Sequence, residues 1–357
     1  PRTRPPENQE RVRRRFARWT IFMSIANVFF SVGIVILLLE ASENWWFTGA
    51  LIYVPQTPFL IPSICLLACS CIWHLRSAWL NVTSMGLLLF TVCGFHFSMK
   101  PFNPPVTSKD DVTVLSCNVQ NFQPHFGEVL REVARSKPDI VVFQEAREVP
   151  EMLTDYLEDW HWQHSGQFLV GSKWPIELLG EFDASPYQRT SAIKVRVKTP
   201  LGPIIVGDVH LQTARRGLTD LSLGSIVDGD GPASVEHHAF LRDEEALQTR
   251  AFLSGNPAGT PFVIAGDFNM PETSSIYDTH FGDLRDVFAE AGLGFGYTAP
   301  CRPVRFWLPR VPWLRIDHVL VSDNWETLEC YTGEFNGSDH RLVAARLSLR
   351  DPQAPPP

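Results

Sequence analysis

Eight polar side chains follow short apolar runs in the second part of the chain. In VIAGDFNMP (263 to 271), a run typical of a buried strand ends at Gly266 and is followed by Asp267 and Asn269. The other six are Asn118, Glu145, His210, Asp317, Asp339 and His340. Carboxylates and imidazoles exchange protons and amides donate hydrogen bonds, so these are side-chain types suited to catalysis.

Taken one at a time, these residues have a simpler explanation. Asn and Asp cap turns, and a single His at the end of a strand more often has a structural partner than a catalytic role. That explanation is favoured for Asn118 and for His210 when each is considered alone. Acids, amides and two histidines at separate strand ends are hard to explain as capping, so the set predicts one shared site.

The elements that must position these residues are short strands. Seven segments are rich in Val and Ile and are bounded by turn residues, at 112–120, 139–146, 192–199, 203–211, 261–269, 315–322 and 341–349. Helical periodicity occupies 127–138 and 237–255. This mixture predicts an α/β fold, in which two packed β-sheets are flanked by helices.

The first part of the chain has a different composition. Between Arg18 and Lys100 the only Asp, Glu, Lys or Arg residues are Glu40, Glu43 and Arg76. The hydropathy predicts about three transmembrane helices, near 19–39, 46–73 and 79–97. Prolines in the second span are tolerated where neighbours re-satisfy the backbone. The alternatives are a single anchor followed by a soluble helical hairpin, and a cleaved signal peptide, which the lack of a small-residue cleavage site disfavours.

Basic residues predict the orientation of these helices. Seven arginines fall within residues 1–18, whereas the loop EASENW after the first span is acidic, so the N-terminus should stay in the cytoplasm. The expected organisation is a basic cytoplasmic tail (1–18), a membrane domain (19–99), a Pro-rich linker (100–110), a soluble domain (111–350) and a disordered tail (351–357). Three crossings of a plasma or inner membrane would place the soluble domain in the periplasm or outside the cell.

Charge and cysteine content restrict the function classes. The formal net charge is −8 even though arginines crowd the N-terminus, so the soluble domain is acidic. The composition therefore does not indicate sequence-independent electrostatic binding of polyanions, unless metal ions screen the site. No cysteine spacing suggests zinc. Cys301 and Cys330 could pair in an oxidising compartment, and the sequence leaves that pairing open.

Six motifs occur in the order LSCNVQNF, DIVVFQEA, GDVHL, IAGDFNMP, RIDHVLVS and GSDHRLV. In this order they resemble the endonuclease/exonuclease/phosphatase superfamily, which includes pancreatic-type deoxyribonucleases, abasic-site endonucleases, inositol polyphosphate phosphatases and neutral sphingomyelinases. The resemblance covers residues 112–349, with no departure at the six motifs. It implies a four-layer α/β sandwich, a divalent metal, Mg²⁺ or alternatively Mn²⁺, and hydrolysis of a phosphate ester.

The resemblance also implies which residues hold the metal. Glu145 and Asn118 would be its ligands, and Asp339 would flank the site as a further metal-binding carboxylate. Hard oxygen ligands of this kind suit Mg²⁺, which keeps several waters and takes a phosphate oxygen of the substrate.

The remaining roles follow from the same resemblance. Asp317 would orient His340, and His340 would act as the general base or polarise the phosphate. Asp267 would position the water or pass a proton to the leaving oxygen. Asn269 would donate a hydrogen bond to the phosphoryl group, and His210 would contact the phosphate from the other side.

Two further segments are candidates for substrate contact. Arg215 and Arg216 lie in ARRGLTD shortly after His210, and Arg305 and Trp307 lie in the loop YTAPCRPVRFWLPRVPWLRID. Their plainer explanations are a solvated helix start and a Pro-rich surface loop. Arginine beside aromatic residues suits phosphates and stacked bases, and equally a lipid headgroup region.

Two functions from different classes are consistent with the sequence. The first is a membrane-anchored, metal-dependent phosphoesterase that hydrolyses a phosphodiester, in nucleic acid or phospholipid, outside the cytoplasm. The second is a non-catalytic membrane-tethered binding or scaffold protein that retained the fold. The complete motif set favours the enzyme.

Overall fold

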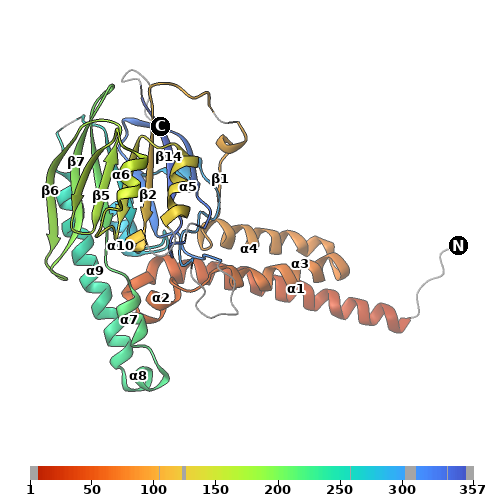
Figure 1. Cartoon of the computed structure of the whole chain (residues 1–357). Helices are drawn as coiled ribbons and strands as arrows, with labels where there is room; N and C mark the ends of the chain where they lie inside the picture. Colours follow the sequence, from red (N-terminus) through yellow and green to blue (C-terminus); the bar gives the residue numbers. More distant parts are fainter. Residues whose placement is uncertain are drawn as a thin grey trace.

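The chain forms a long helical arm and a β-sandwich, and the arm projects from one end of the sandwich (Figure 1). The computed structural model describes residues 7–103, 105–122, 126–257, 259–301, 311–335 and 337–350. The expected tail at 351–357 lies outside these residues. Residues 7–18, expected to form a tail, are the first turns of the first helix.

The first sheet has six strands. In spatial order they are β13 (Trp325–Thr332), β14 (Val343–Leu349), β2 (Asp111–Asn118), β3 (Ile140–Gln144), β5 (Phe168–Ser172) and β4 (His161–Ser165). Only β2 and β3 run parallel; the other neighbours are antiparallel. The parallel pair brings the carboxyl ends of β2 and β3 to the same edge of the sheet.

The second sheet also has six strands. They are β10 (Arg285–Asp286), β12 (Asp317–Val321), β9 (Phe262–Asp267), β8 (Gly202–His210), β7 (Arg189–Thr199) and β6 (Ile176–Ala184). Here β8 and β9 are the parallel pair. Both sheets are therefore mixed, and the sheet order places β2 and β3 opposite β9 and β8.

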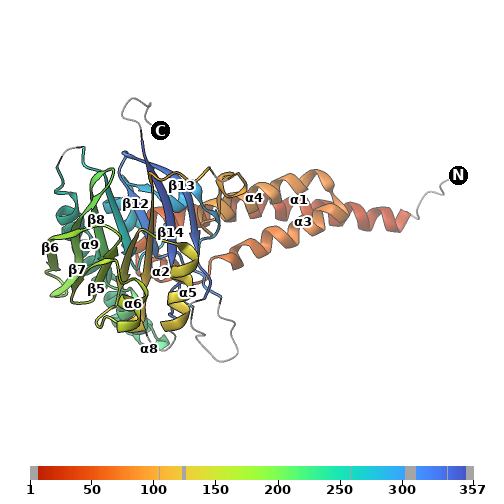
Figure 2. The same ribbon diagram turned by 45° about the horizontal axis from the view of Figure 1, so that its top comes forward.

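The layers follow from the burial of alternate strand residues. Val and Ile side chains from both sheets form one fully buried core between them. Helices cover the outer faces, with α5 (Phe126–Ser136) and α6 (Glu151–Tyr156) on the first sheet and α9 (Asp230–Ser254) and α10 (Ser275–Phe281) on the second. Figure 2 shows helices on both sides of the paired sheets. The predicted four-layer α/β sandwich is confirmed.

Short elements complete the sandwich. They are α7 (Arg215–Thr219), α8 (Leu223–Asp228), α11 (Val287–Ala291) and the pair of β1 (His96–Phe97) with β11 (Leu293–Gly294). The pairing of β1 with β11 fastens the end of the arm to the sandwich. All seven cysteines are free, so Cys301 and Cys330 do not pair.

The arm, residues 7–97, contains three helices that pack on one another. α1 (Glu7–Ile36) continues through a π-helical turn, and the short α2 (Trp46–Leu51) follows. α3 (Ile61–Trp73) and α4 (Ala78–Thr91) form a hairpin against α1, and Figure 1 shows all three side by side.

Polarity in the arm is inverted relative to a water-soluble helical bundle. Large apolar side chains point outward, with Phe29 73% and Trp79 64% exposed. Polar side chains are buried between the helices instead. Asn81 donates to Ser24 Oγ at 2.9 Å, and Asn27 donates to Ser63 Oγ at 2.9 Å. Hydrogen-bonded polar residues inside and apolar residues outside are typical of helices packed within lipid.

The number of long apolar helices differs from the prediction. Among the described residues one helix, Asn8–Asn44, has the length and composition needed to cross a membrane. The expected second span divides, because the chain leaves helical conformation around Val54 and Pro55 before the helical turn at Thr57–Leu60. The expected third span contains only a 14-residue helix. The prediction of three separate membrane-spanning helices was therefore wrong.

One ionisable group lies inside the core of the sandwich. Asp208 on β8 is fully buried and its Oδ1 accepts a hydrogen bond from Gln144 Nε2 on the opposite sheet at 2.6 Å. Burial raises the pKa of Asp208 well above its ordinary value, although the Gln144 bond acts in the other direction. Asp208 Oδ2 and Gln144 Oε1 have no hydrogen-bond partner, and a proton on the carboxyl group would satisfy both.

The buried carboxyl predicts a pH-dependent stability. An unfolded Asp ionises near pH ~3.9, so above that pH folding requires Asp208 to take up a proton. The contribution of Asp208 to the free energy of unfolding is fully present below the pKa of the unfolded state. It falls as pH rises toward the pKa of the folded state, by up to about 1.4 kcal/mol per pH unit. The Asp208→Asn side chain cannot ionise. We therefore expect the melting temperature of this variant, minus that of the wild type, to increase as pH rises from 5 to 8.

Melting curves of the full chain in detergent measure this difference. Asp155→Asn, on the exposed side of α6, is the matched control, and its difference from the wild type should not change with pH. A difference for Asp208→Asn that is the same at pH 5 and pH 8 would show that the buried carboxyl does not control stability.

Candidate active site

Strand pairing brings the predicted residues to one end of the sandwich. In the second sheet Asp267 is the partner of Asp317 on β12 and of His210 on β8. In the first sheet Asn118 pairs with Gln144, the residue before Glu145. Because β2 and β3 end opposite β9 and β8, the two sets of side chains face each other across the edge of the sandwich.

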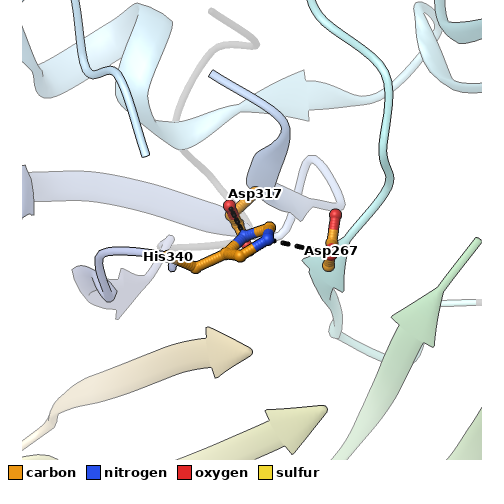
Figure 3. Close-up of side chains that lie close together, drawn as sticks. All are labelled: Asp267, Asp317 and His340. Atoms are coloured by element: carbon orange, nitrogen blue, oxygen red, sulfur yellow. Dashed lines mark hydrogen bonds and ion pairs between the residues drawn. The ribbon is translucent and has the colours of Figure 1, made fainter. Parts of the chain in front are cut away.

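Asp317 and His340 form a buried pair. His340 Nδ1 lies 2.8 Å from Asp317 Oδ2, and its Nε2 lies 3.7 Å from Asp267 Oδ2 (Figure 3). Burial disfavours the imidazolium, but Asp317 and Asp267 outweigh it and raise the pKa of His340 to about 10. His340 is therefore a cation at neutral pH, held in a fixed orientation by Asp317.

Asp267 lies at the centre of the arrangement. Its Oδ2 accepts a hydrogen bond from Asn118 Nδ2 at 3.1 Å and lies 3.7 Å from His210 Nε2. Its Oδ1 accepts from the backbone N–H of Asn269 at 2.9 Å. Burial raises the pKa of Asp267 to about 7, against the opposing effect of His340. A carboxylate whose pKa is near neutrality can accept a proton at working pH.

His210 is oriented by a glutamine that the sequence analysis did not identify. Gln167 Nε2 donates to the Thr190 carbonyl at 2.9 Å, so its Oε1 accepts from His210 Nδ1 at 2.9 Å. Burial, followed by Arg189 and His340, holds the pKa of His210 well below its usual range. His210 is thus neutral, and its unprotonated Nε2 faces Glu145 and Asp267 at 3.9 and 3.7 Å.

Three of the predicted residues form the part of the site suited to a hard cation. Glu145, Asn118 and Asp339 all line one cleft. Glu145 is half-buried and pairs with no Lys or Arg among the described residues. Asn118 Nδ2 points toward Glu145 Oε1 at 3.3 Å, while its Oδ1 accepts from the Gln120 backbone. The side-chain amide of Asn118 would have to flip for its Oδ1 to bind an ion in this position.

A second group also has metal-ligand spacing. Oxygen or nitrogen atoms of Asp267, Asp317 and His340 lie within 4.8 Å of one another. In this group, however, Asp317 and His340 already share a short hydrogen bond, which uses the Nδ1 of His340. This hydrogen bond makes Asp317 and His340 suited to proton chemistry and leaves Glu145 and Asp339 as the candidate cation ligands.

The segment after β9 departs from the extended geometry expected for it. The strand ends at Asp267, and Asn269 has φ 54°, a left-handed conformation that few non-glycine residues adopt. Asn269 nevertheless lines the cleft beside Asp267, and its Nδ2 donates to the Leu211 carbonyl at 2.9 Å. Gly266 is required for close approach, since a Cβ there would lie 2.0 Å from the Val209 carbonyl oxygen.

The cleft has a volume of about 370 Å³ and a cationic wall. Arg147, Arg189 and Arg215 line it. Arg215 was predicted, whereas Arg216 lies over the ring of Tyr187 at 5.8 Å and is not part of the lining. The other substrate predictions, Arg305 and Trp307, fall outside the described residues.

The sequence analysis missed the supporting residues. The cleft is also lined by residues that were not singled out from the sequence: Gln120, Arg147, Gln167, Arg189 and Gln212. Gln120 and Arg147 are only two residues beyond Asn118 and Glu145, so proximity to the motifs was the signal available for them. No sequence signal connects Gln167 or Arg189 to the site.

The fold and the site together define a class of phosphoester-hydrolysing α/β sandwiches, and the comparisons agree. The chain belongs to the Endonuclease/Exonuclease/phosphatase family, whose family model matches residues 115–340. Comparison with curated proteins gave no match.

Solved structures with a similar fold come from several organisms. An endonuclease/exonuclease/phosphatase from Beutenbergia cavernae is 19% identical, covering 68% of this chain and 72% of that chain, with a TM-score of 0.45. D. rerio TDP2 complexed with single-strand DNA product is 12% identical, with coverages of 67% and 100% and a TM-score of 0.48. A Bacteroides thetaiotaomicron mannosyl-6-phosphatase is 15% identical, with coverages of 67% and 100% and a TM-score of 0.45.

Proposed function

We propose that this protein is a membrane-anchored, divalent-metal-dependent phosphoesterase that hydrolyses a phosphodiester outside the cytoplasm. The observation that carries the proposal is that Asp267 lies 3.7 Å from each of two histidines, the cationic His340 and the neutral His210. Glu145 and three arginines line the same cleft. Family membership supports phosphate-ester hydrolysis, and the remaining features of the proposal rest on the residues of this chain.

The oxygen ligands that Mg²⁺ or Mn²⁺ prefers are available from Glu145 and Asp339. Asn118 would add a third if its side-chain amide rotated by half a turn. Such an ion, when bound, neutralises charge on a phosphate oxygen and favours ionisation of water. Among the described residues lining the cleft, no Lys or Arg side chain forms an ion pair with either carboxylate.

The residues of the chain supply the proton chemistry. Asp267, with a pKa near 7, accepts the proton of the attacking water as the water oxygen bonds to phosphorus, and returns a proton to the leaving oxygen as the ester P–O bond breaks. His340 is already protonated and donates a hydrogen bond to the phosphoryl oxygens, where negative charge develops. Of the two roles that the sequence allowed for His340, the structure therefore supports phosphate polarisation rather than general base. Asp317 keeps the imidazolium in place.

The cationic wall supports a substrate with an anionic group beyond the scissile phosphate. Arg147 and Arg215 are exposed, and neither makes a side-chain ion pair with a described residue. One guanidinium group can donate two parallel hydrogen bonds to two oxygens of a phosphate. Nucleic acid meets this requirement, as does a phospholipid whose headgroup carries a second anionic group, and the substrate assay below distinguishes them.

The arm supports anchoring in a bilayer. Its exposed surface is apolar and hydrogen-bonded polar side chains are buried between its helices, an arrangement that is unfavourable in water and favourable in lipid. α1 crosses the bilayer, and the hairpin of α3 and α4 leaves the sandwich and returns to it. The hairpin therefore does not change which side the sandwich occupies. Arginines at the start of α1 favour a cytoplasmic N-terminus.

Turnover by the full chain in lipid nanodiscs tests the proposal. The substrates are bis-p-nitrophenyl phosphate, p-nitrophenyl phosphate, single-stranded and plasmid DNA, and mixed phospholipid vesicles, each with Mg²⁺, Mn²⁺ or EDTA. Hydrolysis that requires metal is expected, and the preferred substrate identifies the class. No turnover by a folded, metal-binding protein on any substrate would favour the binding or scaffold protein.

A protease-protection assay tests the orientation. In inside-out membrane vesicles, added protease should remove an epitope tag placed before residue 1 and spare the sandwich. Cleavage of the sandwich in those vesicles would place it in the cytoplasm and contradict the proposal.

A further inference from the structure

A buried polar cluster joins the arm to the sandwich. Glu43 and Tyr53 come from the arm and Arg242 comes from α9, and both charged residues are buried. Arg242 Nη2 donates to Tyr53 Oη at 2.7 Å, and Arg242 Nη1 lies 3.9 Å from Glu43 Oε1. A buried guanidinium requires such partners, because an unpaired charge in the protein interior is strongly unfavourable.

The same guanidinium holds two backbone segments of the active site. Arg242 Nη2 donates to the Asn269 carbonyl at 3.1 Å, and Arg242 Nε donates to the Gln212 carbonyl at 3.0 Å. Tyr53 Oη also lies 3.5 Å from the Asn269 carbonyl oxygen. Asn269 and Gln212 both line the catalytic cleft. One side chain thus links the arm to the chain immediately after β9 and β8.

The arm also holds the far end of the segment that begins at Asn269. Ser274 Oγ donates to Glu43 Oε1 at 2.6 Å, and the backbone N–H of Ser275 donates to Glu43 Oε2 at 2.9 Å. Ser42 Oγ donates to the Thr273 carbonyl at 2.9 Å. Residues 269–275 are therefore fixed at both ends by the arm.

Asn269 needs this support. Its left-handed backbone is unfavourable for a residue with a Cβ, and such conformations persist only where the surroundings hold them. Its side-chain amide lies at the cleft, and its backbone N–H donates to Asp267 Oδ1 at 2.9 Å. A change in its backbone would move both the amide and the Asp267 carboxylate.

We propose that Tyr53 and Arg242 are positioning residues for Asn269, and that the arm is consequently a working part of the active site in addition to an anchor. This inference rests on the proposed phosphoesterase function. The substrate-contacting groups belong to the sandwich, and the arm fixes the backbone on which one of them is carried.

Tyr53→Phe in the full chain tests this inference. The substitution removes the hydroxyl that meets Arg242 and keeps the ring that packs against it. We expect kcat to fall by about 10- to 100-fold, the loss that a small misplacement of a catalytic group produces. KM should change by much less, and the melting temperature should stay close to that of the wild type. Arg242→Lys retains the charge but not the forked donors, so its kcat should fall as well.

Tyr297→Phe is the matched control. Tyr297 Oη donates to the Cys93 carbonyl at 2.8 Å, so it is another tyrosine bond between sandwich and arm that does not reach Asn269. Its kcat should remain within about twofold of the wild type. An equal loss in Tyr297→Phe would show that general docking of the arm matters and would overturn a specific role for Tyr53.

Hydrogen exchange separates failure of this inference from failure of the proposed function. Peptides covering 268–275 should exchange faster in Tyr53→Phe than in the wild type, whether or not a substrate is known. If the wild type shows no turnover, the proposed function fails and exchange alone tests the positioning. Unchanged exchange and unchanged kcat in Tyr53→Phe would overturn the inference.

Discussion

His340→Gln should lower kcat by roughly 10²- to 10⁴-fold, the range expected for loss of a positioned proton donor or of a group that stabilises developing negative charge. The wild-type imidazole is held between Asp317 at 2.8 Å and Asp267 at 3.7 Å, and these carboxylates keep it protonated. Gln still bonds to the buried Asp317 but carries no positive charge. Steady-state kinetics on bis-p-nitrophenyl phosphate at saturating Mg²⁺ measure the effect.

His161→Gln is the control for this substitution. His161 lies on the exposed edge strand β4, outside the residues that line the cleft, so kcat should not change. Melting temperatures of both variants show whether the fold is retained. A folded His340→Gln variant with wild-type kcat would remove His340 from the catalytic group.

Glu145→Gln should weaken metal activation more than any other substitution at the cleft. Glu145 is half-buried, faces the cleft and has no Lys or Arg partner among the described residues. We expect the Mg²⁺ concentration for half-maximal activity to rise by more than the roughly 10- to 100-fold that follows loss of an outer-sphere partner. Because the amide retains one oxygen, high Mn²⁺ should restore part of the activity. Activity titrations and calorimetric Mg²⁺ binding measure the shift.

Glu148→Gln provides the comparison, since it removes a carboxylate of the same charge from an exposed position three residues later, outside the residues that line the cleft. A similar shift in Glu148→Gln would indicate a general electrostatic effect on cation affinity. An unchanged Mg²⁺ requirement in Glu145→Gln would exclude Glu145 as a ligand.

The sequence predicted the sandwich well where strands are buried on both faces. All seven expected segments contain strands of the two sheets, because runs such as IVVFQ can be accommodated only in a core. Five strands of the two sheets were not predicted: β4, β5, β6, β10 and β13. In β6, IELLGEFDA, charged residues alternate with apolar ones on a half-exposed edge strand, so its burial pattern is weak.

The arm shows a different limit of prediction from the sequence. Hydropathy identified an apolar region but placed the helix ends wrongly, because residues 42–56 are used to dock against the sandwich rather than to extend a helix. Tyr53 bonds to Arg242 across 189 positions of sequence. A contact over that separation leaves no periodic pattern for a single sequence to reveal.

The site was predicted to the extent that strand ends determine it. The eight motif residues lie together because the register pairs Asp267 with both Asp317 and His210. Side-chain orientation was not predictable. The tautomer of His210 depends on Gln167 in another segment, and the direction of the Asn118 amide depends on the Gln120 backbone.

The end of the sandwich to which the arm is attached affects what the enzyme encounters. The arm leaves one end of the sandwich in Figure 1. Residues 269–275 contact this arm and begin at Asn269 in the lining of the cleft, so the arm is attached beside the site. With the arm in a bilayer, the cleft stays within a short, fixed distance of the headgroups. A molecule confined to that surface would reach the cleft at a high effective concentration set by geometry. Turnover would then depend on surface density in the membrane more than on concentration in solution.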